Sequence, residues 1–537
     1  MGDWNMADVY EVIAGRIPDA PCQVQGDRTV TWAEWDRRAN GLAASLLGHG
    51  LGRQAKVAAY LTNCPEYLEV YLAAFKAALV PVNTNFRYGP EEILYLFGNA
   101  DVEAVVFHAQ FAPVIEKIRD RLPKVKAWYV VDDGSPVPDW AEGHDAVADA
   151  GTAIPVTAPW GRSGDDLLLL YTGGTTGMPK GVMWRQDDLF QVIGGGGNPV
   201  LGETPAKDLD DLASRIGGPG FSALAACPLM HGTGQFAALI VMNGGGAIVS
   251  LPAGPFDPVV LWQTAADTQV NAIIMVGDAF GRPMLQALEA HPDDWDLSHL
   301  LLITSSGVMW SQENKDGLLR RLPNTIMYDS LGSSEAVFMA SSSSEAGQAS
   351  ATASFQVSDK VQVITDDGGY VTPGSAEIGM VAIRGFIPIG YYKDEEKSAK
   401  TFRTVQDVRY SIPGDYAQVL ADGSIHLLGR GSVVINTAGE KVFPEEVEEV
   451  LKRHDTVSDA VVVGLPDERF GEVICALIER EPGAVFDEAA LIEFVRSRLA
   501  RFKAPRFVLE VASINRSPAG KVDYASLKRL ATERAAK

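Results

Sequence analysis

The sequence contains few cysteines and few histidines. Its four cysteines lie far apart, among apolar or proline neighbours, and form no CxxC pair: Cys22, Cys64, Cys227 and Cys475. This spacing predicts buried thiols rather than disulfides or zinc ligands. The eight histidines are scattered and form no HxxxH pair, which argues against a zinc site.

Basic side chains are scarce relative to acidic ones. The chain has 46 Lys and Arg against 69 Asp and Glu, a formal net charge of -23 at pH 7. A surface of this sign repels nucleic acid and anionic lipid, so we expect neither as a partner. A site for an anionic ligand must gather its own cations and glycine backbone, so lysines and arginines beside glycines are the first candidates.

The sequence also lacks a hydrophobic run long enough to span a bilayer. The best candidate, residues 237–252, is interrupted by Asn243 and three glycines. The N-terminus has neither a basic region nor an apolar core, so it does not resemble a signal peptide. These features predict a cytoplasmic protein in a reducing compartment.

Helical and strand-like patterns alternate along the first part of the chain. Hydrophobic residues make up 46% of the sequence and charged residues 21%, which is ordinary globular composition. Residues 32–50 have apolar side chains at helical spacing, and residues 56–61 form a short apolar run. This alternation predicts a parallel α/β sheet. Four more buried strands are predicted at 167–174, 247–251, 272–277 and 300–307.

The pattern changes near residue 355. Residues 356–374 and 377–385 alternate with period two and contain glycine-rich turns, which predicts antiparallel strands or a small barrel. After a Gly-Arg-Gly-Ser hinge at 429–432, the chain has the pattern of a compact α+β unit. We therefore predict an α/β protein with a large N-terminal domain (1–429), which includes a small β-barrel-like subdomain, and a small mobile C-terminal domain (430–537). The glycine-rich stretch 193–205 predicts a long mobile loop of functional use.

The segment LLLLYTGGTTGMPKGV, residues 167–182, has the composition of a phosphate-binding loop. Glycines let the backbone approach a phosphate, threonines donate hydroxyl groups, and Lys180 supplies a positive charge. It is not a Walker A loop, because Pro179 precedes the lysine and Gly181 follows it. Taken alone, the segment is equally well explained as a turn with an exposed lysine.

The segment 171–181 resembles the signature loop of the adenylate-forming (AMP-binding) superfamily. That superfamily includes acyl-CoA synthetases, peptide-synthetase adenylation domains and luciferases. Further matching segments follow in the family's order and cover nearly the whole chain: 228–236, 331–336, 377–385, 413–417, 427–432, 438–448, 461–472 and 516–523.

The resemblance implies a nucleotide site. The loop is expected to hold the β- and γ-phosphates of ATP, Glu335 to hold Mg²⁺ together with Thr176, and Asp415 to bind the ribose hydroxyls. Without the resemblance, Asp415 is explained as a turn residue after Gly414. The implied nucleotide-binding set is Thr172, Gly173, Gly174, Thr175, Thr176, Gly177, Lys180, Leu331, Gly332, Ser333, Ser334, Asp415 and Arg430.

The resemblance also implies two half-reactions. Lys521 matches the adenylation lysine, which with Mg²⁺ stabilises the charge that develops when a carboxylate attacks the α-phosphate. Without the resemblance, it would be an exposed C-terminal lysine. The small domain is then expected to rotate, bringing Gly439 and Lys441 to the path of coenzyme A. The implied catalytic residues are Lys521, Glu335, Thr176 and Lys180.

The acyl pocket is expected to be apolar, with Asp278 its only charge. A hydrophobic carboxylic acid is therefore favoured, and the chain looks most like bacterial ligases for fatty acids and steroid side chains. His231 can also be explained as a loop histidine with a structural hydrogen bond. The implied substrate-binding residues are His231, Gln235, Val276, Ser306, Gly307 and Leu331.

Other readings remain open from the sequence. The enzyme could load a carrier protein in place of coenzyme A, act as a luciferase-type oxygenase, or be a nucleotide sensor without chemistry. A homodimer is common among relatives, but no coiled-coil pattern argues for one. The adenine-stacking tyrosine of the family is Leu331 here, for which Tyr328 could substitute, and the usual charged hinge residue is Val433.

Overall fold

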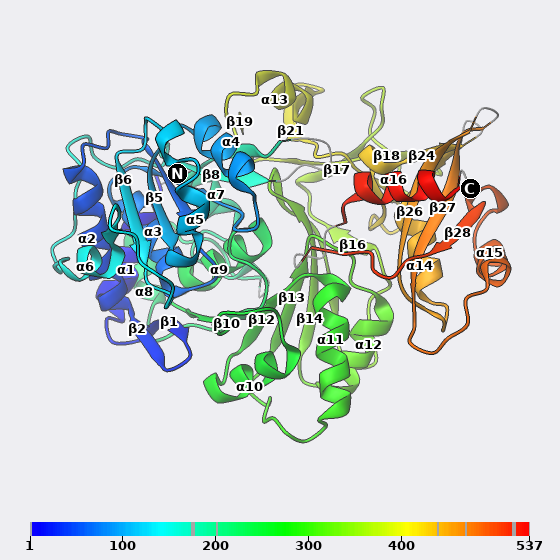
Figure 1. The fold of residues 1–537 in the computed structure, drawn as a ribbon, viewed down its shortest axis with the longest axis horizontal. Coiled ribbons are helices and arrows are strands. Elements are labelled where there is room, and N and C mark those ends of the chain that lie inside the picture. The colour runs from blue at the N-terminus through cyan, green and yellow to red at the C-terminus, as the bar shows by residue number, and fades with distance from the viewer. Residues whose placement is uncertain are drawn as a thin grey trace.

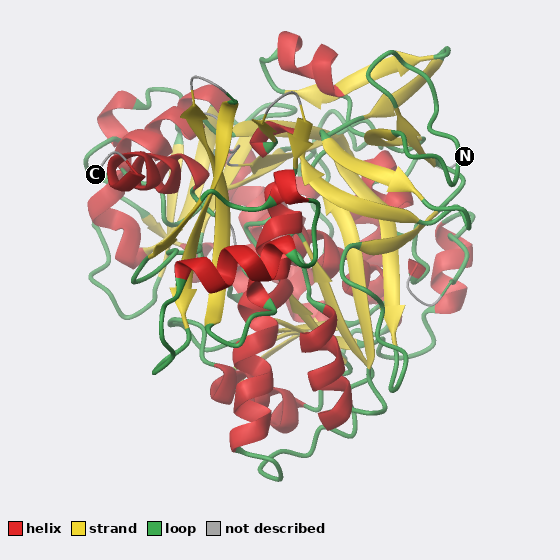
Figure 2. Ribbon diagram, turned by 90° about the vertical axis from the view of Figure 1, so that its right-hand side faces the viewer, coloured by secondary structure: helices red, strands yellow, loops and turns green. Residues whose placement is uncertain are grey.

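The computed structural model of the chain describes residues 3–172, 178–199, 202–437, 440–467, 470–517 and 522–535. Within these residues the strands form three sheets, with helices packed on their faces (Figures 1 and 2). Two large sheets make up the N-terminal part, and a five-stranded sheet forms the C-terminal part. The chain begins in the N-terminal part, and its last described helix lies in the C-terminal part (Figure 1).

The eight-stranded sheet has the order β19-β9-β8-β4-β3-β5-β6-β7. Strands β3 to β8 are parallel, whereas β9 is antiparallel to β8 and β19 is antiparallel to β9. The strands are β3 (Lys56–Tyr60), β4 (Val80–Asn83), β5 (Val102–His108), β6 (Ala127–Val131), β7 (Glu142–Gly143), β8 (Leu167–Thr172), β9 (Lys180–Arg185) and β19 (Gly390–Tyr391). The helices that accompany it are α1 (Met6–Arg16), α2 (Trp32–Gly48), α3 (Pro65–Lys76), α4 (Pro90–Ala100), α5 (Ala112–Ile115) and α6 (His144–Asp149).

The fifteen-stranded sheet is parallel in its first half and antiparallel in its second. The first half, from β1 to β14, contains β1 (Pro21–Gln25), β2 (Arg28–Thr31), which pairs antiparallel with β1 at the edge, β10 (Ser222–Ala225), β11 (Ala247–Ser250), β12 (Ala272–Met275), β13 (Leu302–Ser306) and β14 (Ile326–Ser333). The helices between β9 and β14 in the chain are α7 (Gln186–Val192), which contacts β9 of the eight-stranded sheet, α8 (Leu209–Arg215), α9 (Gly232–Asn243), α10 (Pro258–Thr268), α11 (Gly277–Ala290) and α12 (Gln312–Arg321).

The antiparallel half continues from β14 through β15 and encloses a core of its own around Met339, Phe355 and Val381. It corresponds to the β-rich subdomain expected from the period-two pattern. Its elements are β15 (Ala336–Ser344), β16 (Ser354–Val357), β17 (Val361–Ile364), β18 (Ile378–Arg384), α13 (Glu395–Thr401), β20 (Phe402–Val405), β21 (Val408–Ser411), β22 (Asp415–Val419) and β23 (Ile425–Arg430).

The C-terminal sheet is packed between helices and has separate cores on its two faces. The strands β26 and β27 form a long antiparallel pair, and β28 lies parallel to β27. The elements are β24 (Ile435–Thr437), β25 (Glu440–Val442), α14 (Pro444–Lys452), β26 (Val457–Asp467), β27 (Gly471–Arg480), α15 (Glu488–Arg496), β28 (Phe507–Glu510) and α16 (Tyr524–Ala535).

The strand β8 shows how the eight-stranded sheet separates two cores. Because side chains alternate along a strand, Leu168 and Leu170 face the main core with α1 to α3, whereas Leu169 and Tyr171 face the core covered by α4. Every residue of α3 is buried. The four cysteines are buried and free, as their neighbours predicted.

The glycine-rich segment is packed where it is described. Residues 193–197 are buried, and Gly196, with φ +80°, has Leu212 and Phe190 around its Cα. These residues are therefore packed against the protein, and the predicted mobility of the segment stays a prediction. In the described part of the chain, no helix combines the length and apolar character needed to cross a membrane.

A buried ion network joins α2, α3 and α6 in the N-terminal part. The Glu69 carboxylate lies 2.8 Å from Arg38 Nε and 3.1 Å from His144 Nε2, and all three side chains are buried. Burial opposes a charge on His144, but the Glu69 carboxylate outweighs this and raises the pKa of His144 to about 9. Glu69 is therefore the buried carboxylate that both cations share, while Arg38 also pairs with the exposed Asp145 and Asp149.

We expect Glu69→Gln to lower the free energy of unfolding by about 3–5 kcal/mol, because it leaves two buried cations without their shared carboxylate. Urea unfolding measures this. Glu91→Gln is the control, since Glu91 pairs with Arg121 on the surface with 74% of its side chain exposed, and its loss should cost at most about 1 kcal/mol. Equal effects of the two variants would contradict the prediction.

Candidate active site

The predicted acyl-pocket segments meet at the carboxyl edge of the parallel strands. Strands β10, β12, β13 and β14 are neighbours in the sheet, and the segments that carry His231, Val276, Ser306 with Gly307, and Leu331 follow or end them. In open α/β sheets this edge is where ligands bind.

Two contacts tie these segments together. Thr233 at the start of α9 donates a hydrogen bond from its hydroxyl to the carbonyl of Ser306, at 3.4 Å. A Cβ on Gly232 would lie 3.6 Å from Ser334 Oγ, so the start of α9 also lies against the Ser334–Glu335 turn. His231 is half-buried just before α9, and Val276 is 4% exposed just before α11. Gln235 is fully buried within α9.

The Ser334–Glu335 turn connects β14 to β15 and is held by three side chains. Trp184 donates from Nε1 to the carbonyl of Ser334, at 2.9 Å. Ser411 donates from its hydroxyl to the carbonyl of Glu335, at 2.6 Å. Tyr391 donates from its hydroxyl to Glu335 Oε1, also at 2.6 Å. The backbone and the carboxylate of Glu335 are therefore both fixed.

Lys180 begins β9, directly across the hairpin from Thr172. Its Nζ lies 2.8 Å from Asp394 Oδ2 and 5.9 Å from the centre of the Tyr391 ring. The predicted phosphate-binding segment thus follows β8 in the chain, and its lysine begins the antiparallel strand β9.

Several predicted site residues lie outside the described residues. They are Gly173, Gly174, Thr175, Thr176, Gly177, Gly439 and Lys521. The backbone of Lys441 lies in β25.

Asp415 and Arg430 are paired at the ends of β22 and β23. They are partners in the strand register, and Arg430 Nε lies 3.2 Å from Asp415 Oδ1. The Asp415 carboxylate, and after it the Glu335 carboxylate, outweigh burial and raise the pKa of Arg430. The predicted ribose, metal and hinge residues thus form one charged cluster.

The structure changes the interpretation of two residues. Asp278, expected as the only charge of the acyl pocket, accepts hydrogen bonds from the backbone and the hydroxyl of Ser311, both at 3.0 Å, and so holds the residue that caps α12. Tyr328, considered as a substitute for the adenine-stacking tyrosine, lies three positions before Leu331 on β14. Strand alternation places these two side chains on opposite faces of the sheet.

Sequence reasoning missed the side chains that hold the charged residues. Trp184 reads as an ordinary apolar strand residue, and Ser411 as a polar residue of a short strand. Tyr391 and Asp394 stand in the segment GYYKDEE, where two tyrosines and an acidic run follow a glycine. This unusual composition is the feature of the sequence that could have pointed to a functional segment.

Comparison with known proteins shows the family of the chain. The family model "AMP-binding enzyme" matches residues 10–392, and the model "AMP-binding enzyme C-terminal domain" matches residues 446–521. The chain belongs to the AMP-binding enzyme family. The resemblance inferred from the sequence motifs is confirmed.

Several relatives match this AMP-binding enzyme over nearly its whole length. A medium/long-chain-fatty-acid–CoA/3-oxocholest-4-en-26-oate–CoA ligase of Mycobacterium marinum is 41% identical and covers 97% of this chain and 95% of its own. A 3-oxocholest-4-en-26-oate–CoA ligase of Rhodococcus rhodochrous is 41% identical, with coverages of 97% and 94%. The medium-chain acyl-CoA ligase Mig of Mycobacterium avium is 37% identical, with 96% of each chain covered.

Solved structures confirm the predicted fold class. The anthranilate CoA ligase AuaEII in complex with anthranoyl-AMP has a TM-score of 0.85 at 22% identity and covers 100% of this chain and 98% of its own. The ATP-bound MatB from Rhodopseudomonas palustris has a TM-score of 0.80 at 23% identity, with coverages of 98% and 99%.

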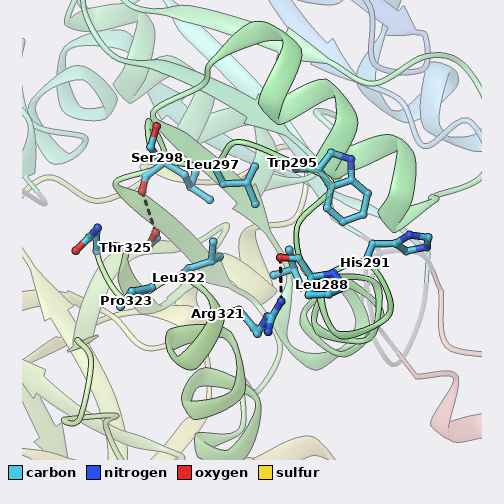
Figure 3. A pocket seen from close by; sticks show the side chains of 12 residues that line it. Leu288, His291, Trp295, Leu297, Ser298, Arg321, Leu322, Pro323 and Thr325 are labelled. Carbon is cyan, nitrogen blue, oxygen red and sulfur yellow. Dashed lines mark hydrogen bonds between the residues drawn. The ribbon is translucent and has the colours of Figure 1, made fainter.

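One pocket of the AMP-binding enzyme lies away from this cluster. A pocket of about 190 Å³ lies between the last turns of α11 and α12. Figure 3 shows Trp295 and Arg321 in its wall. Arg321 donates to the carbonyl of Pro292 at 3.0 Å. Thr325 in the same wall precedes β14, so at about 3.3 Å per residue the strand places the pocket about 25 Å from the Glu335 turn. It is not part of the candidate site.

The C-terminal part contacts the N-terminal part at the end of β23. Glu445 on α14 accepts a hydrogen bond from the Arg430 backbone, at 3.5 Å from Oε1. Its Oε2 is buried, with no hydrogen-bond partner among the described residues. On another surface, Arg282 of α11 donates to the carbonyl of Ser458, at 2.7 Å, and lies 3.5 Å from Asp278.

Burial, and then the charges of Glu448 and Asp415, raise the pKa of Glu445 to about 8, from an ordinary value of 4.5. When Glu445 is exposed, its pKa has the ordinary value of 4.5. Between the two pKa values the carboxyl is therefore protonated in the packed state and ionised when it is exposed. The contribution of this contact to stability is therefore fully present below about pH 4.5 and is lost as the pH rises to about 8. The charged and titratable groups around the carboxyl are Asp415, Arg430, Glu448 and Tyr524.

We expect the full-length wild type to lose about 1–3 kcal/mol of unfolding free energy relative to Glu445→Gln over this pH range, which is the usual cost of an unsatisfied buried polar group. Urea unfolding at each pH measures the difference. Glu449→Gln on the same helix, where Glu449 pairs with Arg453 at 3.5 Å, is the control. A constant difference between wild type and Glu445→Gln across the range would refute the assignment.

Proposed function

We propose that this AMP-binding enzyme is an acyl-CoA ligase whose acid is a medium- or long-chain fatty acid or a steroid side-chain acid. The observation that carries the choice of acid is 41% identity, over 97% of this chain, to a ligase named for both kinds of acid. The acid–thiol ligase class predicted from the sequence is confirmed by the family models and by relatives that are named CoA ligases. A carrier protein as the acceptor has less support, because these relatives are named for CoA.

The reaction has two steps. The carboxylate of the acid attacks the α-phosphate of ATP, pyrophosphate leaves, and acyl-AMP forms. The thiol of coenzyme A then attacks the acyl carbonyl, and AMP leaves. Both steps need donors and cations where negative charge develops.

The residues of the cluster have separate tasks in this proposal. Asp415 would accept hydrogen bonds from the ribose hydroxyls with the carboxylate oxygen that Arg430 leaves free. Lys180 would exchange Asp394 for a phosphate. Ser334 lies in a turn whose carbonyl is held by Trp184, so its hydroxyl is presented from a fixed backbone.

The donor set around Glu335 fits Mg²⁺. This ion keeps several waters and binds proteins through one or two carboxylates together with substrate phosphates. The described residues contain no group of three or more His, Cys, Asp or Glu that could form an all-protein cage. Glu335 would hold the ion with its carboxylate, and the bound ion would neutralise phosphate charge during transfer.

Four further points belong to the proposal. The boundary between the two domains lies at 429–431, the acyl group enters along the edge that carries His231 and Val276, the protein is cytoplasmic, and it forms a homodimer. Supporting the boundary, β23 ends at Arg430 and the C-terminal sheet begins with β24 at Ile435.

The first test is pyrophosphate release with ATP and Mg²⁺ across a panel of acids, with and without coenzyme A. We expect release with medium- and long-chain fatty acids or steroid side-chain acids, and AMP and thioester formation only when coenzyme A is present. Short-chain, aryl and amino acids are the control substrates. Release that ignores coenzyme A would point to a carrier protein, and release only with the control substrates would overturn the proposed acid.

The second test concerns Lys521. We expect Lys521→Ala to slow acyl-AMP formation by about 100- to 1000-fold, because it removes a cation used in the adenylation transition state. Thioester formation from supplied acyl-AMP should be unchanged, because that step does not need this cation. Lys528→Ala is the matched control, since Lys528 lies on α16 and pairs with Glu472 at 3.0 Å. Normal acyl-AMP formation by Lys521→Ala would remove the residue from the mechanism.

A further inference from the structure

A short segment between β19 and α13 touches two charged residues of the proposed nucleotide site. Tyr391 donates its hydroxyl to Glu335 Oε1 at 2.6 Å. Asp394, three residues later, lies 2.8 Å from Lys180 Nζ. The mechanism above gives Tyr391 no task, although it lies against the carboxylate that would hold the metal.

The position of the Tyr391 hydroxyl is set by the strand that carries Lys180. Tyr391 pairs with Val182 of β9, and the next residue along donates its backbone N–H to the carbonyl of Gly181. The backbone N–H of Tyr391 donates to Ser398 Oγ at 2.8 Å. Its ring is 5% exposed, with its centre 5.7 Å from that of Phe402. The side chain therefore has little freedom to move.

The hydrogen bond to Glu335 has a defined chemistry. The phenol is the donor in this contact and the carboxylate oxygen is the acceptor. A donor on Oε1 fixes the plane of the carboxylate and the direction of Oε2. Outer hydrogen-bond partners of this kind orient metal-binding side chains and tune their affinity.

We propose that Tyr391 is a positioning residue of the nucleotide site, which holds the Glu335 carboxylate in the orientation that binds the metal ion of metal·ATP. The inference rests on the proposed function, because it assigns Glu335 to that ion. Tyr391 acts on the metal through Glu335. Because Tyr391 lies on β19, which pairs with β9, the strand pair that positions Glu335 also positions Lys180.

The next residue supplies a matched control. Tyr392 also donates its hydroxyl to a carboxylate, Asp101 Oδ2, at 2.8 Å. That contact lies on the side of α4, and Asp101 is also paired with Lys124 and Lys393. Tyr392→Phe therefore removes the same chemical group from the same segment without touching Glu335.

The test is calorimetric binding of ATP to the full-length protein, once with Mg²⁺ and once with EDTA, in the absence of acid. The wild type should bind ATP more tightly with Mg²⁺. We expect Tyr391→Phe to reduce this metal-dependent gain by about 10-fold or more, as outer-shell substitutions do, and to leave binding in EDTA unchanged. Tyr392→Phe should keep the full gain.

A double-mutant cycle with Glu335→Gln completes the test. If Tyr391 acts through Glu335, Tyr391→Phe has no further effect on the metal-dependent gain once Glu335 is replaced. Thermal melting checks folding. Should Tyr391→Phe not fold, Ser398→Ala is expected to reduce the same gain, since it removes the hydroxyl that accepts from the Tyr391 backbone and donates to the carbonyl of Asp394.

The outcomes separate the two ideas. An unchanged metal-dependent gain in Tyr391→Phe, with normal wild-type binding, overturns the role of Tyr391 and leaves the proposed function standing. So does an equal loss in Tyr391→Phe and Tyr392→Phe, since it shows a general effect on the fold. A wild type that binds no ATP in either condition overturns the proposed function and this inference together.

Discussion

The turn that carries Glu335 is pinned by hydrogen bonds from three separate parts of the chain. Trp184 lies on β9, Tyr391 on β19 and Ser411 on β21. The first two belong to the eight-stranded sheet, whereas the turn and Ser411 belong to the fifteen-stranded sheet. The position of one carboxylate thus depends on how the two large sheets are docked. Because protein interiors are close-packed, a small shift between the sheets would be felt directly at this turn.

The charges of the site are balanced in pairs against an acidic background. Lys180 faces Asp394, and Arg430 faces Asp415, in a chain of net charge -23. Such pairing keeps cations in place without leaving them unpaired near a low-dielectric interior. In the proposed function, an incoming triphosphate must then compete with the Asp394 carboxylate for Lys180. In a chain this acidic, the binding of an anionic ligand therefore depends on where these few cations lie.

The sequence patterns were sufficient to locate strands such as 56–60 and 167–172, since apolar runs of this length leave little choice of structure. The resemblance to the AMP-binding family predicted that Glu335, Asp415 and Arg430 belong to one site, and the structure pairs Arg430 with Asp415. The contact between Tyr391 and Glu335 could not be predicted in this way. It arises from pairing of β19 with β9, two elements far apart in the chain, and two-residue strands have no periodicity to read. The same limit applies to Trp184, whose indole N–H is invisible in an apolar strand pattern.

The end of β23 links the site to the position of the C-terminal part. Arg430 pairs with Asp415 through its side chain, while its backbone N–H faces Glu445 of α14. Gly429 beside it has φ +129°, and a Cβ there would lie 2.2 Å from Glu445 Oε2, so only glycine admits this approach. The domain rotation in the proposed mechanism would separate Glu445 from this strand end and return its carboxyl to water, where ionisation is easy. The arrangement seen here is therefore favoured while the carboxyl keeps its proton. Arg430 then joins Asp415, the proposed ribose ligand, to Glu445 of the C-terminal part.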